Sequence, residues 1–550
     1  MKRIFALFGV LALAACGAPS DPSTIVVPEV NARAVASGGQ RLLVPKIDWA
    51  PCGAEFPGTE CGVAEVPLAY DHPFGKITFI ALARVPASDP KNKVGTVFVN
   101  PGGPGGSGVG MVLGGFGETL ANLLGGRFDV VGFDPRGVGR SDPIQCFDTM
   151  DDRAAYFATL PVFPYRRDQE RPFFDLMRSL SGVCFGRGQP ITSHMSTADV
   201  VRDLDLLRQA VGDERLTFLG FSYGSYIGNT YANMFPRKVR ALVIDGVLDP
   251  RLWSSGWQVA SDRVATAREF GEFLRLCDEA GPDCALGAPG GSGKRFEALA
   301  QALLKAPLVF PDGFAYSYDY LVADATSAMY MPEFWGGPDG YGAFFGSLAD
   351  AVLGAPTALE RAAEIRGAIR ARLDAASPER LVYNNGAEAY YGNQCADTQY
   401  PSFLPAFTVI GAWAREGSFF GPFWWWQNAG CANWPVSPDR HAGPWDARTS
   451  APVLVVGNLF DGVTDYAGAV ASSKLLQNSR LLTYAGWGHT AFLRSECVTG
   501  HVLAYLSDGT LPLKGTVCPA NPNPFLPAPM MLRAAAREPM VGLPPVWTKR

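Results

Sequence analysis

The sequence predicts an α/β fold with a mostly parallel central sheet and helices on both faces. Short apolar runs bounded by turn residues recur at 95–99, 128–133 and 216–220, as is typical of buried parallel strands. Helical patterns alternate with these runs; at 197–207, Thr197 stands at a capping position before apolar residues at helical spacing. Alternation of strands with helices predicts a parallel sheet covered on both sides.

Composition excludes two broad classes of protein. The 550 residues are 47% hydrophobic and 18% charged, which supplies a sizeable core and excludes a largely disordered chain. The formal net charge is −5 and no concentrated basic patch occurs. Because such a chain repels phosphates, nucleic acid is not an expected partner.

The first residues predict export. Lys2 and Arg3 precede an apolar run at 4–12 and a zone of small residues, so 1–15 is interpreted as a signal peptide. Leu13-Ala14-Ala15-Cys16 resembles the bacterial lipobox, in which the cysteine is lipidated. We expect a cell-envelope protein that touches a membrane only through Cys16, with 16–45 as a tether; an ordinary secretory signal is the alternative. No later run reaches the roughly 18 apolar residues that a spanning helix needs.

The cysteines predict disulfides. Ten remain after Cys16, an even number, and an oxidising compartment favours bridges. No C-x-x-C pair is present, so a metal site is not expected. Spacing does not fix connectivity, but pairing of sequence neighbours would give Cys52–Cys61, Cys146–Cys184, Cys277–Cys284, Cys395–Cys431 and Cys497–Cys518.

The order of patterns predicts one core interrupted by an insertion. The first part of the core spans 46–250, and its last strand is expected at 241–245. Residues 251–447 are mostly helical and aromatic, and the strand pattern returns at 452–457 within the second part, 448–518. An insertion of this kind forms a lid over the carboxyl ends of the strands; its helices are expected at 261–280, 294–305 and 357–376. The Pro-rich tail, 519–550, is expected to lie extended on the surface.

A serine at a sharp turn is the candidate nucleophile. Gly220-Phe221-Ser222-Tyr223-Gly224 is a G-x-S-x-G motif between a predicted strand and a predicted helix, where a strained turn exposes the serine hydroxyl. A hydroxyl needs a base within hydrogen-bond reach, and the base needs an orienting acid.

The base and the acid are sought on later loops. His489 follows a predicted strand at 481–484, which puts the imidazole at the carboxyl edge of the sheet. Asp461 follows the strand at 452–457 and is the expected acid; Asp465, its rival, is better explained as a helix cap. The remaining histidines have surface or packing explanations: His72, His194, His441 and His501.

Two backbone N–H groups are candidates for binding an oxyanion. One belongs to Tyr223, which follows the nucleophile. The other is assigned to Gly103, in the glycine-rich run 100–108 after an early strand, because glycine lets the backbone approach a reacting carbonyl.

Two other patterns are weaker. Residues 290–295 lack the first glycine and the Ser/Thr of a phosphate-binding loop, so a loop before a helix is expected there. The aromatic run 419–426 could line a substrate pocket or pack the insertion on the core.

Taken together, these motifs resemble the secreted α/β-hydrolases that include tripeptidyl aminopeptidases and, more distantly, prolyl aminopeptidases. The resemblance covers nearly all of the mature chain. Its motifs are IDWAPC at 47–52, VPLAY at 66–70, NPGGPGGSG at 100–108, DPRGVGRS at 134–141, GFSYGSYIG at 220–228, DGVLDP at 245–250, AGWGH at 485–489 and LPLKGTVC at 511–518.

The resemblance implies an α/β-hydrolase fold and a Ser222, Asp461, His489 triad, with no metal or organic cofactor. It also implies an aminopeptidase that releases short peptides from free N-termini, with a lid carboxylate holding the substrate ammonium. Asp397 matches a family cysteine-x-aspartate stretch and is the expected carboxylate. The alternatives are an esterase with the same triad and, from another class, a lipoprotein that binds a ligand without turnover.

Overall fold

The computed structural model describes residues 43–375 and 383–527. Cys16, the signal peptide, nearly all of the predicted tether and tail residues 528–550 lie outside the described residues. Within the described part of the chain, no helix is both long enough and apolar enough to cross a membrane.

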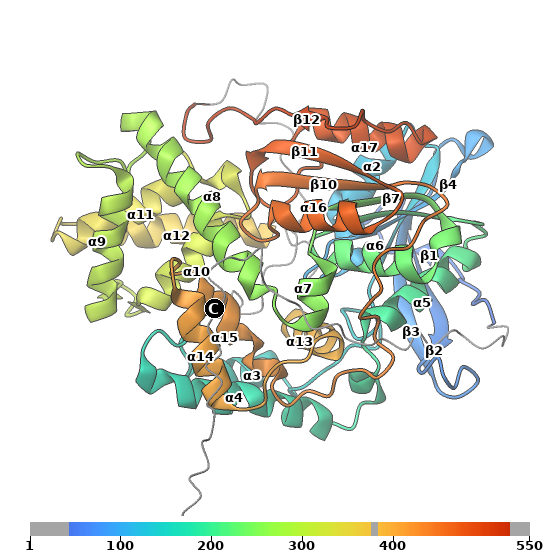
Figure 1. Ribbon diagram of the computed structural model, residues 1–550, viewed down its shortest axis with the longest axis horizontal. Coiled ribbons are helices and arrows are strands. Elements are labelled where there is room, and N and C mark those ends of the chain that lie inside the picture. Colours follow the sequence, from blue (N-terminus) through green and yellow to red (C-terminus); the bar gives the residue numbers. More distant parts are fainter. Residues whose placement is uncertain (1–42, 376–382, 528–550) are drawn as a thin grey trace, which may run out of the picture.

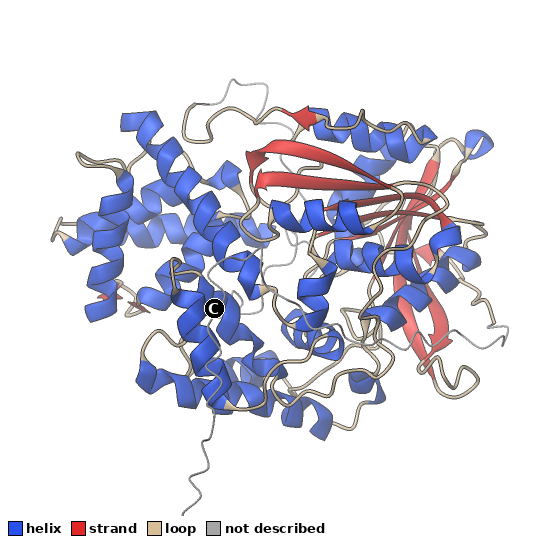
Figure 2. Ribbon diagram, in the orientation of Figure 1, coloured by secondary structure: helices blue, strands red, loops and turns tan. Residues whose placement is uncertain are grey.

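A ten-stranded sheet forms the centre of the protein, in the order β1-β2-β3-β5-β4-β6-β7-β10-β11-β12. In this order the first three pairs, β1–β2, β2–β3 and β3–β5, are antiparallel. All later pairs, from β5–β4 to β11–β12, are parallel. The strands are β1 (Ala50–Pro51), β2 (Glu60–Pro67), β3 (Ile77–Val85), β4 (Gly95–Asn100), β5 (Phe128–Phe133), β6 (Leu216–Phe221), β7 (Val239–Asp245), β10 (Val453–Phe460), β11 (Ser479–Trp487) and β12 (Val517–Cys518). The predicted α/β class is confirmed, and the sheet crosses the right half of Figure 2.

Helices cover both faces of this sheet because its central strands are apolar on both sides. In β4, Phe98 faces one apolar cluster and its neighbours Val97 and Val99 face another. The first cluster contains residues of α5 (Thr197–Ala210), α6 (Tyr223–Met234) and α16 (Tyr466–Leu475). The second contains residues of α1 (Gly108–Met111), α2 (Gly117–Leu123) and α17 (Glu496–Asp508).

The cap of α5 differs by one residue from the expectation. Ser196, not Thr197, is the N-cap, and its hydroxyl accepts the Asp199 N–H. Thr197 is the first helical residue, and its hydroxyl bonds to other groups described below.

The insertion between β7 and β10 is mostly helical, as expected. The predicted helices correspond to α8 (Val259–Ala280), α9 (Ser292–Lys305) and α12 (Ala358–Ala375). Figure 1 shows α8, α9, α11 and α12 grouped beyond the β10–β11 end of the sheet, away from β1 to β3. The other elements are α7 (Pro250–Ser255), β8 (Leu308–Val309), β9 (Ala315–Tyr316), α10 (Tyr318–Ala328), α11 (Tyr341–Val352), α13 (Gly386–Asp397), α14 (Leu404–Arg415) and α15 (Gly421–Trp426).

A second segment packs with the insertion, although the sequence analysis assigned it to the core. Between β5 and β6 lie α3 (Met150–Phe157) and α4 (Arg167–Gly186). Phe173 of α4 packs against Trp426, and Phe174 packs against Phe407. Periodicity in a sequence does not identify what an apolar helix face packs against.

The described part of the tail is anchored as well. Phe525 is buried and its ring packs against Phe273 and Trp335 of the insertion. The expectation of a surface segment is therefore wrong at this position, because the Phe525 side chain is buried among apolar side chains of the insertion.

Five disulfides join cysteines that are neighbours along the chain. One of them ties the end of α13 to the segment after α15. The pairs are Cys52–Cys61, Cys146–Cys184, Cys277–Cys284, Cys395–Cys431 and Cys497–Cys518.

A buried ion pair ties the segment after β5 to α5. Arg136 is 0% exposed, and its guanidinium donates to both carboxylate oxygens of Asp203, at 2.7 and 2.6 Å. It also donates to the main-chain oxygens of Pro67 and Leu68 at 3.0 and 2.8 Å. It donates to the His194 carbonyl oxygen as well, at 3.2 Å. The DPRGVGRS motif is therefore explained in part by this arginine, which bonds to acceptors from three segments.

We predict that Arg136→Met destabilises the protein by about 3–5 kcal/mol, because it leaves the Asp203 carboxylate buried without its counter-charge. Urea unfolding followed by fluorescence measures the loss. The control is Arg187→Met, which removes a surface pair with Asp148 and should leave the free energy of unfolding unchanged. Equal stability of Arg136→Met and wild type would contradict this account.

Candidate active site

Ser222 lies on a strained turn between β6 and α6. Its φ of 56° and ψ of −122° are rare for a residue with a side chain. The turn is tight: a Cβ on Gly220 would lie 2.4 Å from the Gly224 carbonyl oxygen, and a Cβ on Gly224 would lie 2.8 Å from the Asn100 carbonyl oxygen. Both glycines of the motif are therefore required by close approach. The Ser222 N–H donates to the Asp245 carbonyl oxygen at 2.9 Å, which fastens the turn to the end of β7.

The glycine-rich run after β4 lies directly against this turn. A Cβ on Gly102 would lie 2.8 Å from Ser222 Cβ and 2.9 Å from the Tyr223 nitrogen. The Gly102 N–H is already used, because it donates to Asn100 Oδ1 at 2.9 Å. The next N–H along the chain, that of Gly103, is therefore the candidate donor on this side.

Tyr223 supplies the second candidate donor. It is the first residue of α6, so its N–H has no acceptor within the helix. Its side chain points elsewhere: the hydroxyl is hydrogen-bonded to the Thr197 hydroxyl in a buried position. The main chain of Tyr223, and not its phenol, is therefore the part available to the site.

His489 and Asp461 face each other on neighbouring loops. His489 follows β11 and Asp461 follows β10, and the imidazole Nδ1 lies 3.1 and 3.0 Å from the two carboxylate oxygens. The other nitrogen, Nε2, is buried and has no hydrogen-bond partner among the described residues. Ser222, Asp461 and His489 thus lie on loops at the carboxyl ends of parallel strands, with one imidazole nitrogen held and the other unused.

The surroundings of Asp461 favour its ionised form. Burial opposes ionisation, but the His489 imidazole and the N–H groups of Thr464 and Val463 outweigh burial and lower the pKa of Asp461. These N–H groups donate at 2.8 and 2.9 Å, and the Thr464 hydroxyl donates at 2.8 Å. The carboxylate is therefore charged wherever a histidine base would work.

The His489 loop is held by main-chain contacts on both sides. The Asn458 amide donates to the carbonyl oxygens of Gly488 and Thr490 at 2.7 and 2.8 Å. The Arg494 guanidinium donates to the carbonyl oxygens of His489 and Thr490, at 2.7 Å each. The Tyr330 ring, from the insertion, packs edge-on against the imidazole with centroids 5.2 Å apart.

Asp245 links this loop to the nucleophile turn. Its carboxylate accepts the N–H groups of Ala491 and Phe492 at about 3 Å, while its carbonyl accepts the Ser222 N–H. Burial raises the pKa of Asp245 to about 6, against the effect of these two N–H groups.

Two lid carboxylates lie in buried positions near the site. Asp397 accepts the Thr197 N–H through one carboxylate oxygen at 2.8 Å and the Thr197 hydroxyl through the other at 2.5 Å. Burial raises the pKa of Asp397 to about 7. Asp262, on α8, accepts one hydrogen bond from the Gln258 amide at 2.7 Å. Burial, and then the charges of Asp465 and Asp461, raise the pKa of Asp262 well above its usual range.

The rival residues of the sequence analysis have structural explanations. Asp465 caps α16 by accepting the Ala467 N–H and pairs with Arg268 at 2.5 Å. Residues 290–295 form the loop and first turn of α9. In the aromatic run, Trp425 and Trp426 are buried against Phe407, which favours packing over a pocket.

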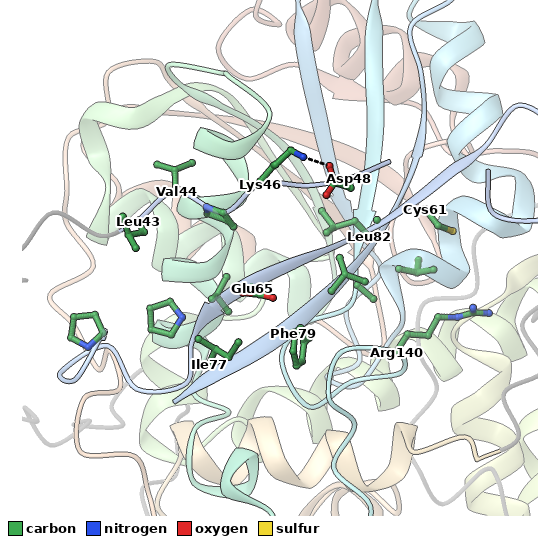
Figure 3. A pocket seen from close by; sticks show the side chains of 18 of the residues that line it. Leu43, Val44, Lys46, Asp48, Cys61, Glu65, Ile77, Phe79, Leu82 and Arg140 are labelled. Atoms are coloured by element: carbon green, nitrogen blue, oxygen red, sulfur yellow. Dashed lines mark ion pairs between the residues drawn. The ribbon is translucent and has the colours of Figure 1, made fainter. Parts of the chain in front are cut away.

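A surface cleft of about 960 Å³ lies away from the three candidate residues. It is lined by the first described residues, such as Leu43 and Val44, and by β2 and β3. Figure 3 shows Ile77 and Phe79 among the lining side chains, with Glu65 and Leu82 between them and the Lys46–Asp48 ion pair. None of Ser222, Asp461 and His489 lines it, so the chemistry does not lie there.

The sequence did not predict a role in the site for several residues near it: Asp245, Asp262, Glu269, Tyr330 and Thr464. For Glu269 the sequence offers one indirect indication. Glycines stand directly beside the candidate acid and base, Gly462 after Asp461 and Gly488 before His489. A glycine beside a catalytic residue can mark the close approach of another group.

We predict that the stability of wild type relative to Asp245→Asn falls as pH rises from 4 to 6. In this interval the unfolded chain has lost a proton that the native Asp245 retains, so the free energy of unfolding decreases by on the order of 1 kcal/mol per pH unit. Above pH 6 the difference is constant. Urea titrations of both proteins between pH 4 and 8 measure it, and a difference independent of pH would be the contrary result.

Comparisons with known proteins found matches over most of the chain. A family model described as "alpha/beta hydrolase fold" matches residues 95–269, and one described as "TAP-like protein" matches residues 417–518. Serine protease Hip1 of Mycobacterium tuberculosis is 32% identical over 520 residues, covering 88% of this chain and 94% of that protein.

Two further relatives carry different names. Tripeptidyl aminopeptidase of Streptomyces lividans is 29% identical over 515 residues, covering 90% of each chain. Carboxylesterase B of Mycobacterium tuberculosis is 29% identical over 529 residues, covering 93% of this chain and 96% of that protein. With these matches over most of its length, the chain belongs to the α/β-hydrolase family, in the group with a TAP-like C-terminal region.

Proposed function

We propose that this chain is a serine peptidase of the aminopeptidase type, with Ser222 as nucleophile, His489 as base and Asp461 as orienting acid. The observation that carries the proposal is the contact of His489 Nδ1 with both carboxylate oxygens of Asp461. The other imidazole nitrogen, Nε2, has no hydrogen-bond partner among the described residues. Ser222 adds a strained turn with a positive φ. The relatives named serine protease and tripeptidyl aminopeptidase support it.

In the acylation step, His489 Nε2 takes the proton of the Ser222 hydroxyl as Oγ attacks the scissile carbonyl carbon. The carbonyl oxygen becomes an oxyanion and accepts hydrogen bonds from the N–H groups of Gly103 and Tyr223. The imidazolium then gives its proton to the leaving amine, and the C–N bond breaks. Ionised Asp461 stabilises the imidazolium and holds the tautomer in which Nδ1 carries a proton.

In the deacylation step, water replaces the amine. His489 takes a proton from water as its oxygen attacks the acyl carbon, and the same proton returns to Ser222 Oγ when the ester bond breaks. The products are a short peptide and the shortened substrate. The step requires no metal or organic cofactor.

An aminopeptidase must also bind the substrate ammonium, and two buried carboxylates are candidates. Asp397, the residue expected from the family resemblance, already accepts two hydrogen bonds from Thr197. Asp262 lies close enough to Asp461 for that charge to raise its pKa, and its own charge raises the pKa of Tyr330, whose ring contacts His489. Burial disfavours the charge of Asp262, and an arriving ammonium would restore it, so we propose Asp262 as the stronger candidate.

Export and anchoring belong to the same proposal. The signal peptide and the lipobox cysteine Cys16 would attach the enzyme to a membrane of the cell envelope, with peptides as substrates. Five disulfides in the described residues are in keeping with an oxidising compartment.

Ester hydrolysis is the second candidate activity, favoured by the relative named carboxylesterase B. The same triad would serve both reactions, because an ester needs less protonation of its leaving group than an amide. Cleavage of a reporter ester therefore does not separate the two functions.

We predict that chromogenic peptides with free N-termini are cleaved, that their N-acetylated counterparts are not, and that Ser222→Ala lowers turnover by at least about 10³-fold. Release of the chromophore, with mass spectrometry of the products, gives the length of peptide released. Ester cleavage that depends on Ser222, without cleavage of any peptide, would favour the esterase.

We also predict that Asp262→Asn raises the KM for free peptides about 10-fold or more, because an amide cannot compensate the ammonium charge. Asp397→Asn is the matched control, a buried carboxyl of the same insertion. Steady-state kinetics on one free peptide and one reporter ester compare them; Asp262→Asn should leave the ester unaffected. A larger effect of Asp397→Asn on the peptide KM would return the role to Asp397.

A further inference from the structure

A buried carboxylate of the insertion contacts both loops that carry the proposed acid and base. Glu269, on α8, accepts the Gly462 N–H through Oε2 at 2.6 Å and the Gly488 N–H through Oε1 at 2.6 Å. Gly462 directly follows Asp461, and Gly488 directly precedes His489. One carboxylate therefore spans the two peptide units next to the acid and the base.

The two glycines fit this close approach. A Cβ on Gly462 would lie 2.4 Å from Glu269 Oε2, so a larger residue would displace the carboxylate. Gly488 has a φ of +90°, and a Cβ there would lie 2.6 Å from a side-chain carbon of Pro332. Both positions are thus restricted to glycine, one by Glu269 itself and one by the turn that aims an N–H at it.

Burial of the Glu269 carboxyl is energetically unfavourable by itself. The residue is 0% exposed, and burial followed by the charge of Asp461 raises its pKa well above the usual range. The two N–H groups and Arg494 act in the opposite direction. A carboxyl buried beside another carboxylate is destabilising unless its hydrogen bonds offset the burial.

Helix α8 makes further contacts with the Asp461 loop. The Thr266 hydroxyl, one turn before Glu269, donates to the Gly462 carbonyl oxygen at 2.5 Å. Both main-chain groups of Gly462, the N–H and the C=O, are therefore bonded to α8. The loop after β10 is therefore held by the insertion as well as by the sheet.

We propose that Glu269 is a positioning residue, which fixes the distance between Asp461 and His489 by holding the peptide units beside them. The proposal rests on the triad proposed above. It assigns to α8 a part in the alignment of the acid and the base, in addition to covering the strand ends. Glu269 touches neither substrate nor the reacting atoms; it acts through Gly462 and Gly488.

The test compares Glu269→Gln with Glu272→Gln. In Glu269→Gln, the side-chain amide keeps one acceptor oxygen but turns its NH₂ group toward the second N–H, so one of the two loops is released. Glu272 lies three residues further along α8, and its hydrogen bonds in the described structure go to the side chains of Arg275 and Trp487. It is the same substitution on the same helix without the two main-chain bonds.

We predict that Glu269→Gln lowers kcat about 10- to 100-fold with KM within about twofold of wild type, because a small misplacement of the base weakens the chemical step and not binding. Glu272→Gln should retain wild-type kcat. Rates on one reporter ester are expressed per active site, counted by labelling with a fluorophosphonate, so that a loss of folded protein does not imitate a loss of kcat.

Glu269→Asp is the second variant. It keeps the carboxyl group, but its shorter side chain cannot reach both N–H groups, so the same fall in kcat is expected. A kcat within about twofold of wild type in either folded variant would overturn the proposal. Loss of the native circular dichroism spectrum in both would also overturn it, since Glu269 would then serve folding alone. If the proposed triad itself is wrong, the wild-type protein will not react with the fluorophosphonate, and this result separates that failure from a failure of the Glu269 proposal.

Discussion

Hydrogen bonds from main-chain N–H groups to buried carboxylates hold the three loops of the site in one arrangement. Asp245 accepts two N–H groups of the segment after His489, Asp461 accepts those of Val463 and Thr464, and Glu269 accepts one from each of two loops. Each acceptor is 0% exposed. A buried carboxyl group without hydrogen-bond partners is unfavourable, whereas one that accepts main-chain N–H groups holds their loop in place. The position of each loop therefore depends on its carboxyl group, and the burial of each carboxyl group depends on its loop.

This constraint explains why the sheet and the insertion act together. The parallel strands bring Ser222, Asp461 and His489 to one edge, although more than half of the intervening chain belongs to the insertion. The insertion then adds Glu269, Thr266 and Tyr330 to the same loops. The insertion, which the sequence predicts to be a lid, therefore also helps to hold the loops at the carboxyl ends of the strands.

The sequence predicted the features whose evidence is local. Apolar runs and glycine motifs located the strands, the Ser222 turn and the loops of Asp461 and His489, and the six central strands lie close to their expected positions. It did not predict Glu269 or Asp262, because an acidic residue on an amphipathic helix has the same pattern whether it faces solvent or a catalytic loop. It likewise missed the packing of α4 and Phe525, since the partner of an apolar side chain distant in sequence is set only by the tertiary fold.

The identity of the nucleophile is the claim on which the account depends. The most direct measurement is mass spectrometry of the protein after reaction with a fluorophosphonate, with the adduct located by proteolytic peptides. The account predicts one equivalent of adduct, on Ser222, and a rate of labelling that falls sharply in Asp461→Asn. An adduct on another residue, or peptide hydrolysis that continues after Ser222 is fully labelled, would contradict it.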